Sequence, residues 1–143
     1  MIRPAREADD DAMAATLGAW VAETDWMPKL HSPDEDRWFC GHLIETGLVW
    51  VADCRDGLGF LASKDNEVAA LYLPPALRGQ GWGRALLTAA KAGRNRLTLW
   101  TFQANTRAIA FYQREGFVVG GFTDGRANAE KLPDAHLIWE RDA

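Results

Sequence analysis

Hydrophobic and polar positions follow two different periods along this chain, and the changes between them mark the predicted elements. Apolar residues that recur at helical spacing predict helices, and short apolar runs bounded by turn residues predict strands. The predicted helices span residues 9–22, 34–45, 83–93 and 106–115. The predicted strands span residues 2–5, 48–54, 58–64, 67–73, 96–102, 117–123 and 135–141.

The order of these elements separates an antiparallel part from a part with a crossover. Asp56-Gly57 and Lys64-Asp65-Asn66 are typical of tight turns, so the three strands 48–54, 58–64 and 67–73 are predicted to be joined by two hairpins. Strand, helix and strand then alternate, which implies a parallel pair with a right-handed crossover. The pattern therefore predicts an α/β fold (α+β in some schemes) with a mixed, mostly antiparallel sheet flanked by helices.

The length of 143 residues suits one domain, 1–143, that is large enough to bury a core. The sequence contains no internal repeat, low-complexity segment or linker. The irregular stretch 123–134 is predicted to be a loop long enough to serve as a functional lid.

A glycine-rich stretch between strand 67–73 and helix 83–93 carries the strongest chemical signal. It reads Arg78-Gly79-Gln80-Gly81-Trp82-Gly83-Arg84. The first N–H groups of a helix lack partners within the helix and carry the positive end of its dipole. Glycines leave those groups accessible, so the stretch predicts a phosphate-binding loop, with arginines that can add charge and planar hydrogen bonding.

Other phosphate-binding motifs do not fit this stretch. The dinucleotide fingerprint would need a glycine where Arg84 stands, and no Gly-Lys-Ser or Gly-Lys-Thr of a P-loop occurs in the chain. A plain strand-to-helix turn is the other interpretation of the same residues.

A second cluster, from Asn105 to Phe117, carries an independent signal. Asn105 is a good helix N-cap, Ala108, Phe111 and Tyr112 recur at helical spacing, and Gly116 is typical of a helix end. The spacing Arg-x-x-Gly-x-Gly and the later Asn-x-x-Ala-x-x-Phe-Tyr-x-x-x-Gly-Phe together resemble the two signatures of the GNAT superfamily of N-acetyltransferases. The resemblance covers the whole chain, and the chain looks like a bacterial subgroup of that family.

The resemblance implies the GNAT fold, in which the parallel central strands splay apart and strand 67–73 carries a bulge. It also implies that acetyl-CoA binds there as acetyl donor, with the pantetheine arm beside the backbone of Leu71 and Leu73. Pro74 and Pro75 end strand pairing at that place. The implied cofactor-binding residues are Leu71, Leu73, Arg78, Gly79, Gln80, Gly81, Trp82, Gly83, Arg84 and Asn105.

The same resemblance implies catalytic residues. Tyr112 matches the family tyrosine near the thioester sulfur, where it would protonate the departing thiolate; otherwise it is a core residue. Glu67, at the start of the central strand, is the candidate general base, because several family members place a carboxylate there. Ordered water is an alternative to a base residue, and His31 is another candidate. His42 and His136 are interpreted as structural.

The acceptor amine is predicted to lie against the variable segments 20–33 and 123–134. Trp26, His31, Glu130 and Asp134 are its candidate contacts. The tryptophans within periodic elements are interpreted as core residues: Trp20, Trp38, Trp50, Trp100 and Trp139.

Composition narrows the partners. The net charge of −4 and the pI of about 5.3 disfavour nucleic acid and mildly favour cationic substrates. No apolar run is long enough to span a membrane and no signal peptide opens the chain, so we expect a cytoplasmic protein without a membrane partner. Cys40 and Cys54 make no disulfide framework, and Cys40-Gly41-His42 lacks the further ligands of a metal site, so no metal is expected.

The sequence therefore predicts an acetyl-CoA-dependent N-acetyltransferase that acts directly on a primary amine of a small molecule or peptide. Two alternatives stay open: a non-catalytic acyl-CoA sensor of the same fold, and an enzyme that uses a larger acyl group. A homodimer is compatible with the family.

Overall fold

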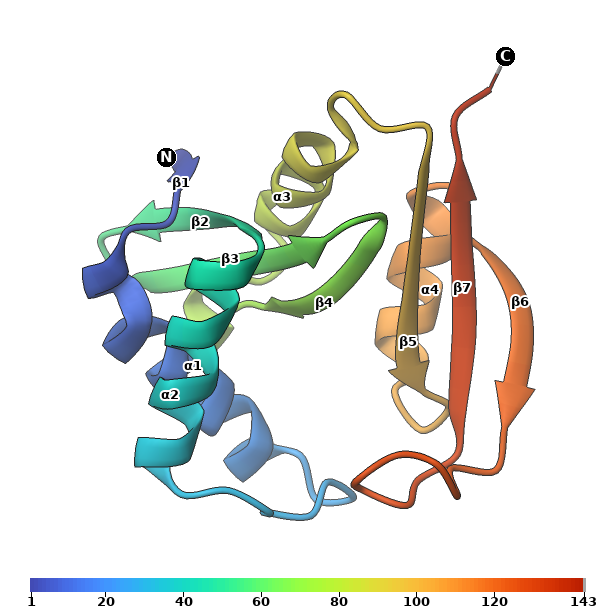
Figure 1. Cartoon of the computed structure of the whole chain (residues 1–143), viewed down its shortest axis with the longest axis horizontal. Helices are drawn as coiled ribbons and strands as arrows, with labels where there is room; N and C mark the ends of the chain where they lie inside the picture. The colour runs from blue at the N-terminus through green and yellow to red at the C-terminus, as the bar shows by residue number, and fades with distance from the viewer. Residues whose placement is uncertain (143) are drawn as a thin grey trace. The chain divides into compact units, whose positions relative to one another are not determined.

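The computed structural model describes residues 1–142, and the chain divides into two compact units, Met1–Ala92 and Gly93–Ala143 (Figure 1). The elements of the first unit are β1 (Ile2–Pro4), η1 (Glu7–Asp9), α1 (Asp10–Glu23), α2 (Pro33–Thr46), β2 (Leu48–Cys54), β3 (Gly57–Lys64), β4 (Glu67–Tyr72), η2 (Pro75–Leu77) and α3 (Trp82–Lys91). Those of the second are β5 (Arg96–Phe102), α4 (Thr106–Arg114), β6 (Val118–Thr123) and β7 (Asp134–Glu140).

Each predicted helix and strand is present, with ends that differ from the prediction by no more than two residues. The two short 3-10 helices were not predicted, because three residues leave no periodic signal. The first hairpin turn is one residue earlier than predicted, since Gly57 already pairs with Cys54 across the two-residue loop. The second turn is as predicted, with Lys64 opposite Glu67 and Asp65 at a φ of +54°.

The first unit is an antiparallel sheet, in the order β1-β2-β3-β4, that carries helices on both faces. Because strand side chains alternate, Val49, Val51, Phe60 and Ala62 share one face. They form a core with Met13 of α1 and Cys40 of α2. Helix α3 contacts β2 and β3 and buries Leu86, Leu87 and Ala90 (Figure 1).

The second unit is a three-stranded antiparallel sheet with β7 between β5 and β6. Helix α4 contacts β6. Leu97 and Leu99 of β5 and Ala135 and Leu137 of β7 are almost fully buried. This alternation leaves the intervening positions of the two strands on the other face.

Two tryptophans that we expected in the core lie on the surface instead. Trp38 is 70% exposed, because a separation of two residues on a helix places it about 200° from Cys40, the buried residue of α2. Its ring stacks on that of His42. Trp100 is 48% exposed because it alternates with Leu97 and Leu99, and it stacks on His136. Trp139 is buried as predicted.

Candidate functional site

The segment between β4 and α3 is braced by its own hydrogen bonds. The N–H groups of Leu77 and Arg78 donate to the carbonyls of Pro74 and Pro75, at 3.0 and 3.3 Å. The Gln80 side chain donates to the carbonyl of Ala76 at 2.7 Å. Leu77 is only 3% exposed and anchors the segment in the core. The loop that leads into α3 therefore has a defined shape.

Gly79 and Gly81 give this loop the properties of an anion-binding cradle. Their φ angles are +73° and +88°, and a Cβ built on either residue would meet no atom within 4 Å. Glycine is thus required by the backbone conformation, and the space beyond each α-carbon is open. Gly81 is the N-cap of α3 and has no side chain that could occupy the helix end. A polyphosphate fits this end of the helix, because backbone N–H groups and the helix dipole favour an anion there.

Leu71 and Leu73 flank the last residue of β4. Leu71 pairs with Leu61 of β3, and Leu73 lies just beyond the end of β4, where Pro74 and Pro75 follow. A Cβ at Gly59 would lie 2.4 Å from Cδ2 of Leu73, so the Leu73 side chain depends on a glycine in β3. The register between β3 and β4 shifts at Ala62/Ser63, which is the irregularity that the family resemblance implied for this strand.

Arg78 is predicted to bind the phosphates, yet its guanidinium contacts other groups of the chain. Its Nε donates to the carbonyl of Leu73 at 3.1 Å, and its terminal nitrogen forms a hydrogen-bonded ion pair with the carboxylate of Glu23. Its role toward a phosphate stays a prediction. The arginine bridges the end of α1 and the end of β4.

Trp26 lies in the loop 24–32, as predicted, and belongs to a cluster of aromatic rings. Its ring meets that of Trp20 edge-on, with centroids 5.9 Å apart. Trp20 in turn contacts Tyr72 at 5.3 Å, and Tyr72 contacts the buried Phe60 at 5.8 Å. The cluster connects the core to the loop through Tyr72, the residue between Leu71 and Leu73. Trp20 is half-buried in this cluster.

The two candidate bases of the first unit are exposed. Glu67 opens β4, four residues before Leu71, and an extended strand covers about 13 Å over that distance. Glu67 therefore lies far from the end of the strand, and its role as a base stays a prediction. Nδ1 of His31 lies 3.6 Å from a carboxylate oxygen of Glu35, in the first turn of α2.

In the second unit, Asn105 and Tyr112 occupy the two ends of α4. Asn105 is the N-cap of the helix, and its Oδ1 accepts a hydrogen bond from the N–H of Ala108 at 3.2 Å, as the sequence predicted. Tyr112 is 7% exposed, and its ring lies edge-on to those of Phe111 and Phe117. This packing fixes the orientation of the phenol ring.

The loop 123–134 is held by its own polar groups. The Asp134 carboxylate accepts hydrogen bonds from the hydroxyl of Thr123 and, at 3.3 Å, from the amide of Asn128. The Gln103 side chain donates to the carbonyls of Thr123 and Asp134, at 3.1 and 3.0 Å. Asp134 therefore has a structural function in this loop besides its predicted contact with the acceptor. Glu130 is half-buried in the same loop.

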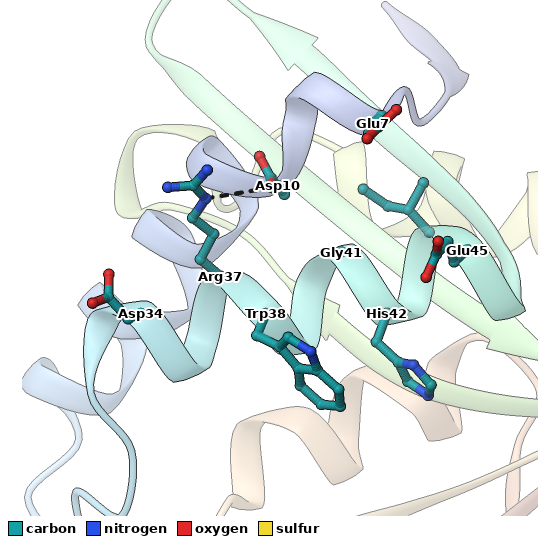
Figure 2. A pocket seen from close by; sticks show the side chains of 9 residues that line it. Glu7, Asp10, Asp34, Arg37, Trp38, Gly41, His42 and Glu45 are labelled. Carbon is teal, nitrogen blue, oxygen red and sulfur yellow. Dashed lines mark hydrogen bonds and ion pairs between the residues drawn. The ribbon is translucent and has the colours of Figure 1, made fainter.

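A groove lies along α2, and none of the residues predicted to bind cofactor or acceptor lines it. Figure 2 shows Arg37 pointing toward Asp10, where its Nε lies 3.5 Å from the carboxylate. The groove is lined by Glu7, Asp10, Asp34, Arg37, Trp38, Gly41, His42, Ile44 and Glu45.

Two further findings concern the chemistry of the described residues. Within residues 1–142, no group of three or more His, Cys, Asp and Glu side chains could hold a metal ion. No helix in this range is long and apolar enough to cross a membrane.

The chain is similar to a known protein family and to several characterised proteins. The family described as the acetyltransferase (GNAT) domain matches residues 45–119. The peptidyl-lysine N-acetyltransferase YjaB of Salmonella typhimurium is 28% identical over 96% of this chain and 97% of its own. The peptidyl-lysine N-acetyltransferase YiaC of Escherichia coli is 30% identical over 78% of this chain and 81% of its own.

Solved structures show the same fold. The solution structure of apo-form YjaB from Escherichia coli aligns with a TM-score of 0.78 at 25% identity, over 97% of this chain and 96% of that one. YncA from Salmonella typhimurium, solved with its cofactor acetyl-CoA, aligns with a TM-score of 0.74 at 21% identity, over 100% and 94%. The predicted α/β fold class is confirmed, and the chain belongs to the GNAT family of N-acetyltransferases.

Four residues that contact predicted site residues, or stand next to them in the sequence, could not be predicted from the sequence. Glu23, Tyr72 and Gln103 received no role, and Trp20 was assigned to the core alone. The hydrogen bond between Glu23 and Arg78 joins residues 55 positions apart in the sequence, and the one between Gln103 and Thr123 joins residues 20 positions apart. A single sequence has no signal for such pairs, because only the tertiary fold brings them together.

Proposed function

We propose that this protein transfers an acetyl group from acetyl-CoA directly to a primary amine, with a lysine side chain of a peptide or protein as the acceptor it prefers. The observation that carries the proposal is the open glycine cradle at the start of α3. Gly79 and Gly81 expose the backbone there, where a Cβ would fill the space that a pyrophosphate needs.

The acceptor class rests on the relatives. YjaB and YiaC are both named peptidyl-lysine N-acetyltransferases, and the first aligns over nearly the whole of both chains. The aromatic cluster of Trp20, Trp26 and Tyr72 agrees with an acceptor that carries an alkyl stem, because aromatic faces pack well on methylene groups. A small-molecule amine with such a stem would be accepted on the same grounds.

The cofactor would be held by the backbone of the cradle and by the end of β4. The Leu73 carbonyl already accepts one hydrogen bond, from Arg78, and its second lone pair can accept another from the pantetheine arm. Bound acetyl-CoA would supply the activated acetyl thioester. Asn105 is proposed to contact the cofactor in addition to capping α4.

Proton transfer is assigned to two residues of this chain. A lysine amine at pH 7 is neutral in only about one molecule in a thousand, so a path for its proton is needed. Glu67 is proposed to receive that proton through water. Tyr112 is proposed to donate a proton to the thiolate, because its buried ring holds the phenol in one orientation.

We propose that the reaction takes place in the cytoplasm. Cys40 and Cys54 form no disulfide, which agrees with the reducing cytoplasm as the place of the reaction.

The test is calorimetric titration of CoA into the wild-type protein and into Gly81→Val, with NADH and ATP as control ligands. Valine at a φ of +88° distorts the cradle and puts carbon atoms into the open space. We expect CoA affinity to fall at least about 100-fold, since two charge-assisted hydrogen bonds are lost.

Gly93→Val is the matched control, because Gly93 has a φ of +75° and equally open space but lies beyond the other end of α3. Both variants should lose a similar stability of about 1–2 kcal/mol. Normal CoA affinity in Gly81→Val would contradict the cradle. Tight CoA binding by a wild-type protein that acetylates neither lysine peptides nor small amines with an alkyl stem would instead favour the acyl-CoA sensor.

A further inference from the structure

Arg78 connects three segments of the first unit. Its Nε donates to the Leu73 carbonyl at the end of β4, and its terminal nitrogen pairs with Glu23, the last residue of α1. Arg78 itself begins the glycine loop that leads into α3. The two side chains are 38% and 37% exposed, so their ion pair adds little to global stability. The pair instead fixes the end of α1 relative to the end of β4 and the glycine loop.

Glu23 is directly followed by the loop 24–32, which contains Trp26. The start of this loop is fixed to α1, because the Thr24 hydroxyl donates to the Trp20 carbonyl at 2.6 Å and the Met27 N–H donates to the Thr24 carbonyl at 3.0 Å. The ring contacts from Trp26 through Trp20 to Tyr72 lead back to the end of β4. The loop is therefore attached to the cofactor side of the unit at two points, the ring cluster and the Arg78 bridge.

We propose that Glu23 and Arg78 form a positioning pair that couples the glycine loop to the loop 24–32, so that CoA binding orders the segment that receives the acceptor. This rests on the proposed use of acetyl-CoA. Arg78 acts here through Glu23 and Leu73 rather than as a ligand of the phosphates. Coupling of this kind is reciprocal, so ordering of the loop 24–32 also tightens CoA binding.

The fork shape of arginine is what the bridge requires. A guanidinium has five N–H donors in a fixed plane and can bond Leu73 and Glu23 at the same time. A lysine would keep the positive charge but could not hold both partners from one planar group. Arg78→Lys therefore separates the bridge from the charge, and Glu23→Gln removes the carboxylate with little change of shape.

The first experiment needs no ligand. Hydrogen exchange of the backbone amides, read by mass spectrometry, is compared for wild type, Glu23→Gln and Arg78→Lys. We expect exchange in residues 24–30 to be about 5- to 10-fold faster in both variants. Glu45→Gln is the matched control, since Glu45 stands in the last turn of α2 as Glu23 does in α1, and it should exchange like the wild type.

The second experiment adds CoA. In the wild type, CoA should slow exchange in residues 24–30, and each single variant should lose this protection and bind CoA about 5- to 10-fold more weakly. The double variant Glu23→Gln/Arg78→Lys should bind no more weakly than either single variant, because both remove the same bridge.

Four results would overturn the proposal. An exchange rate in residues 24–30 of Glu23→Gln equal to that of the wild type would show that the ion pair does not order this loop. Tighter CoA binding by Glu23→Gln would show that Glu23 competes with phosphate for Arg78. Full loss of affinity confined to the Arg78 variant would make Arg78 a direct ligand. Failure of the wild type to bind CoA would sink the proposed function and the coupling, while the ligand-free exchange rates would still report on the bridge.

Discussion

Tyr112 combines packing with proposed chemistry in a single residue. Its ring is fixed between Phe111 and Phe117, and this contact survives when only the hydroxyl is removed. A residue with both functions can therefore be dissected by one substitution.

We expect Tyr112→Phe to keep wild-type CoA affinity and thermal stability while kcat falls about 100-fold, because a proton donor at the thiolate is lost. Steady-state assay of thiol release with a lysine peptide, beside calorimetry with CoA, provides the measurement. An unchanged kcat would make Tyr112 a packing residue only.

The two cysteines differ in burial, and this sets their reactivity. Cys40 is fully buried, and burial, with the nearby carboxylates of Asp36 and Asp10, raises the pKa of its thiol to about 12. Cys54 is half-buried at the end of β2. The thiolate is the reactive form, so Cys40 should be inert while the fold is intact.

We expect iodoacetamide at pH 8 to alkylate Cys54 in the folded protein and to reach Cys40 only in denaturant. Peptide mass spectrometry before and after addition of urea reads this directly, and Cys54→Ser supplies the control. Equal labelling rates in the folded state would contradict the burial of Cys40.

At the scale of elements, β1 and η1 are tied together by one arginine. Arg3 of β1 makes two hydrogen bonds to the Asp9 carboxylate, at 2.8 and 2.9 Å, and one to Asp53 of β2 at 3.1 Å. The side chains of Arg3 and Asp9 are nearly buried, at 11% and 12% exposure. Hydrogen bonding to Arg3 lowers the pKa of Asp9 below its ordinary value.

A lowered pKa in the folded state stabilises the protein above the ordinary Asp pKa, and this stabilisation is lost as pH falls through the folded-state pKa. Asp9→Asn should therefore cost about 2 kcal/mol at pH 7. The difference from wild type should shrink below about pH 4.

Urea unfolding at a series of pH values measures both effects. Asp11→Asn is the control, because Asp11 is 74% exposed and pairs with Arg37 at the surface. A difference between Asp9→Asn and wild type that grows on acidification would contradict this account.

On the scale of the whole molecule, the net charge of −4 favours the encounter with a cationic acceptor. Salt screens such steering, because the Debye length falls from about 10 Å at 0.1 M to about 3 Å at 1 M.

We expect KM for a lysine-rich peptide to rise several-fold when the salt concentration is raised from about 0.05 M to about 0.5 M, while kcat changes little. A neutral peptide with one lysine is the control and should respond less. An equal response of both peptides would show that charge does not select the acceptor. The homodimer stays a prediction.

Much of the fold, and the local geometry around several candidate site residues, could be predicted from the sequence alone. The spacing of hydrophobic residues and the turn residues predicted the helices and strands, because these signals are local to each element. The two motifs marked the glycine loop, Asn105 and Tyr112 as candidate site residues, since a cap, a positive φ and a helix spacing each depend on neighbours in the chain. Their roles toward the cofactor stay predictions. The family followed from the same residues.

Only the tertiary structure decided which side chains meet across the chain. The ion pair of Glu23 with Arg78 and the contact of Trp20 with Tyr72 join residues that are more than 50 positions apart, and no local pattern encodes either. The exposure of Trp38 and Trp100 has the same cause, because a period shows that one face is apolar but not which residue of the element turns toward the core. Packing makes that choice, and packing is a property of the folded chain.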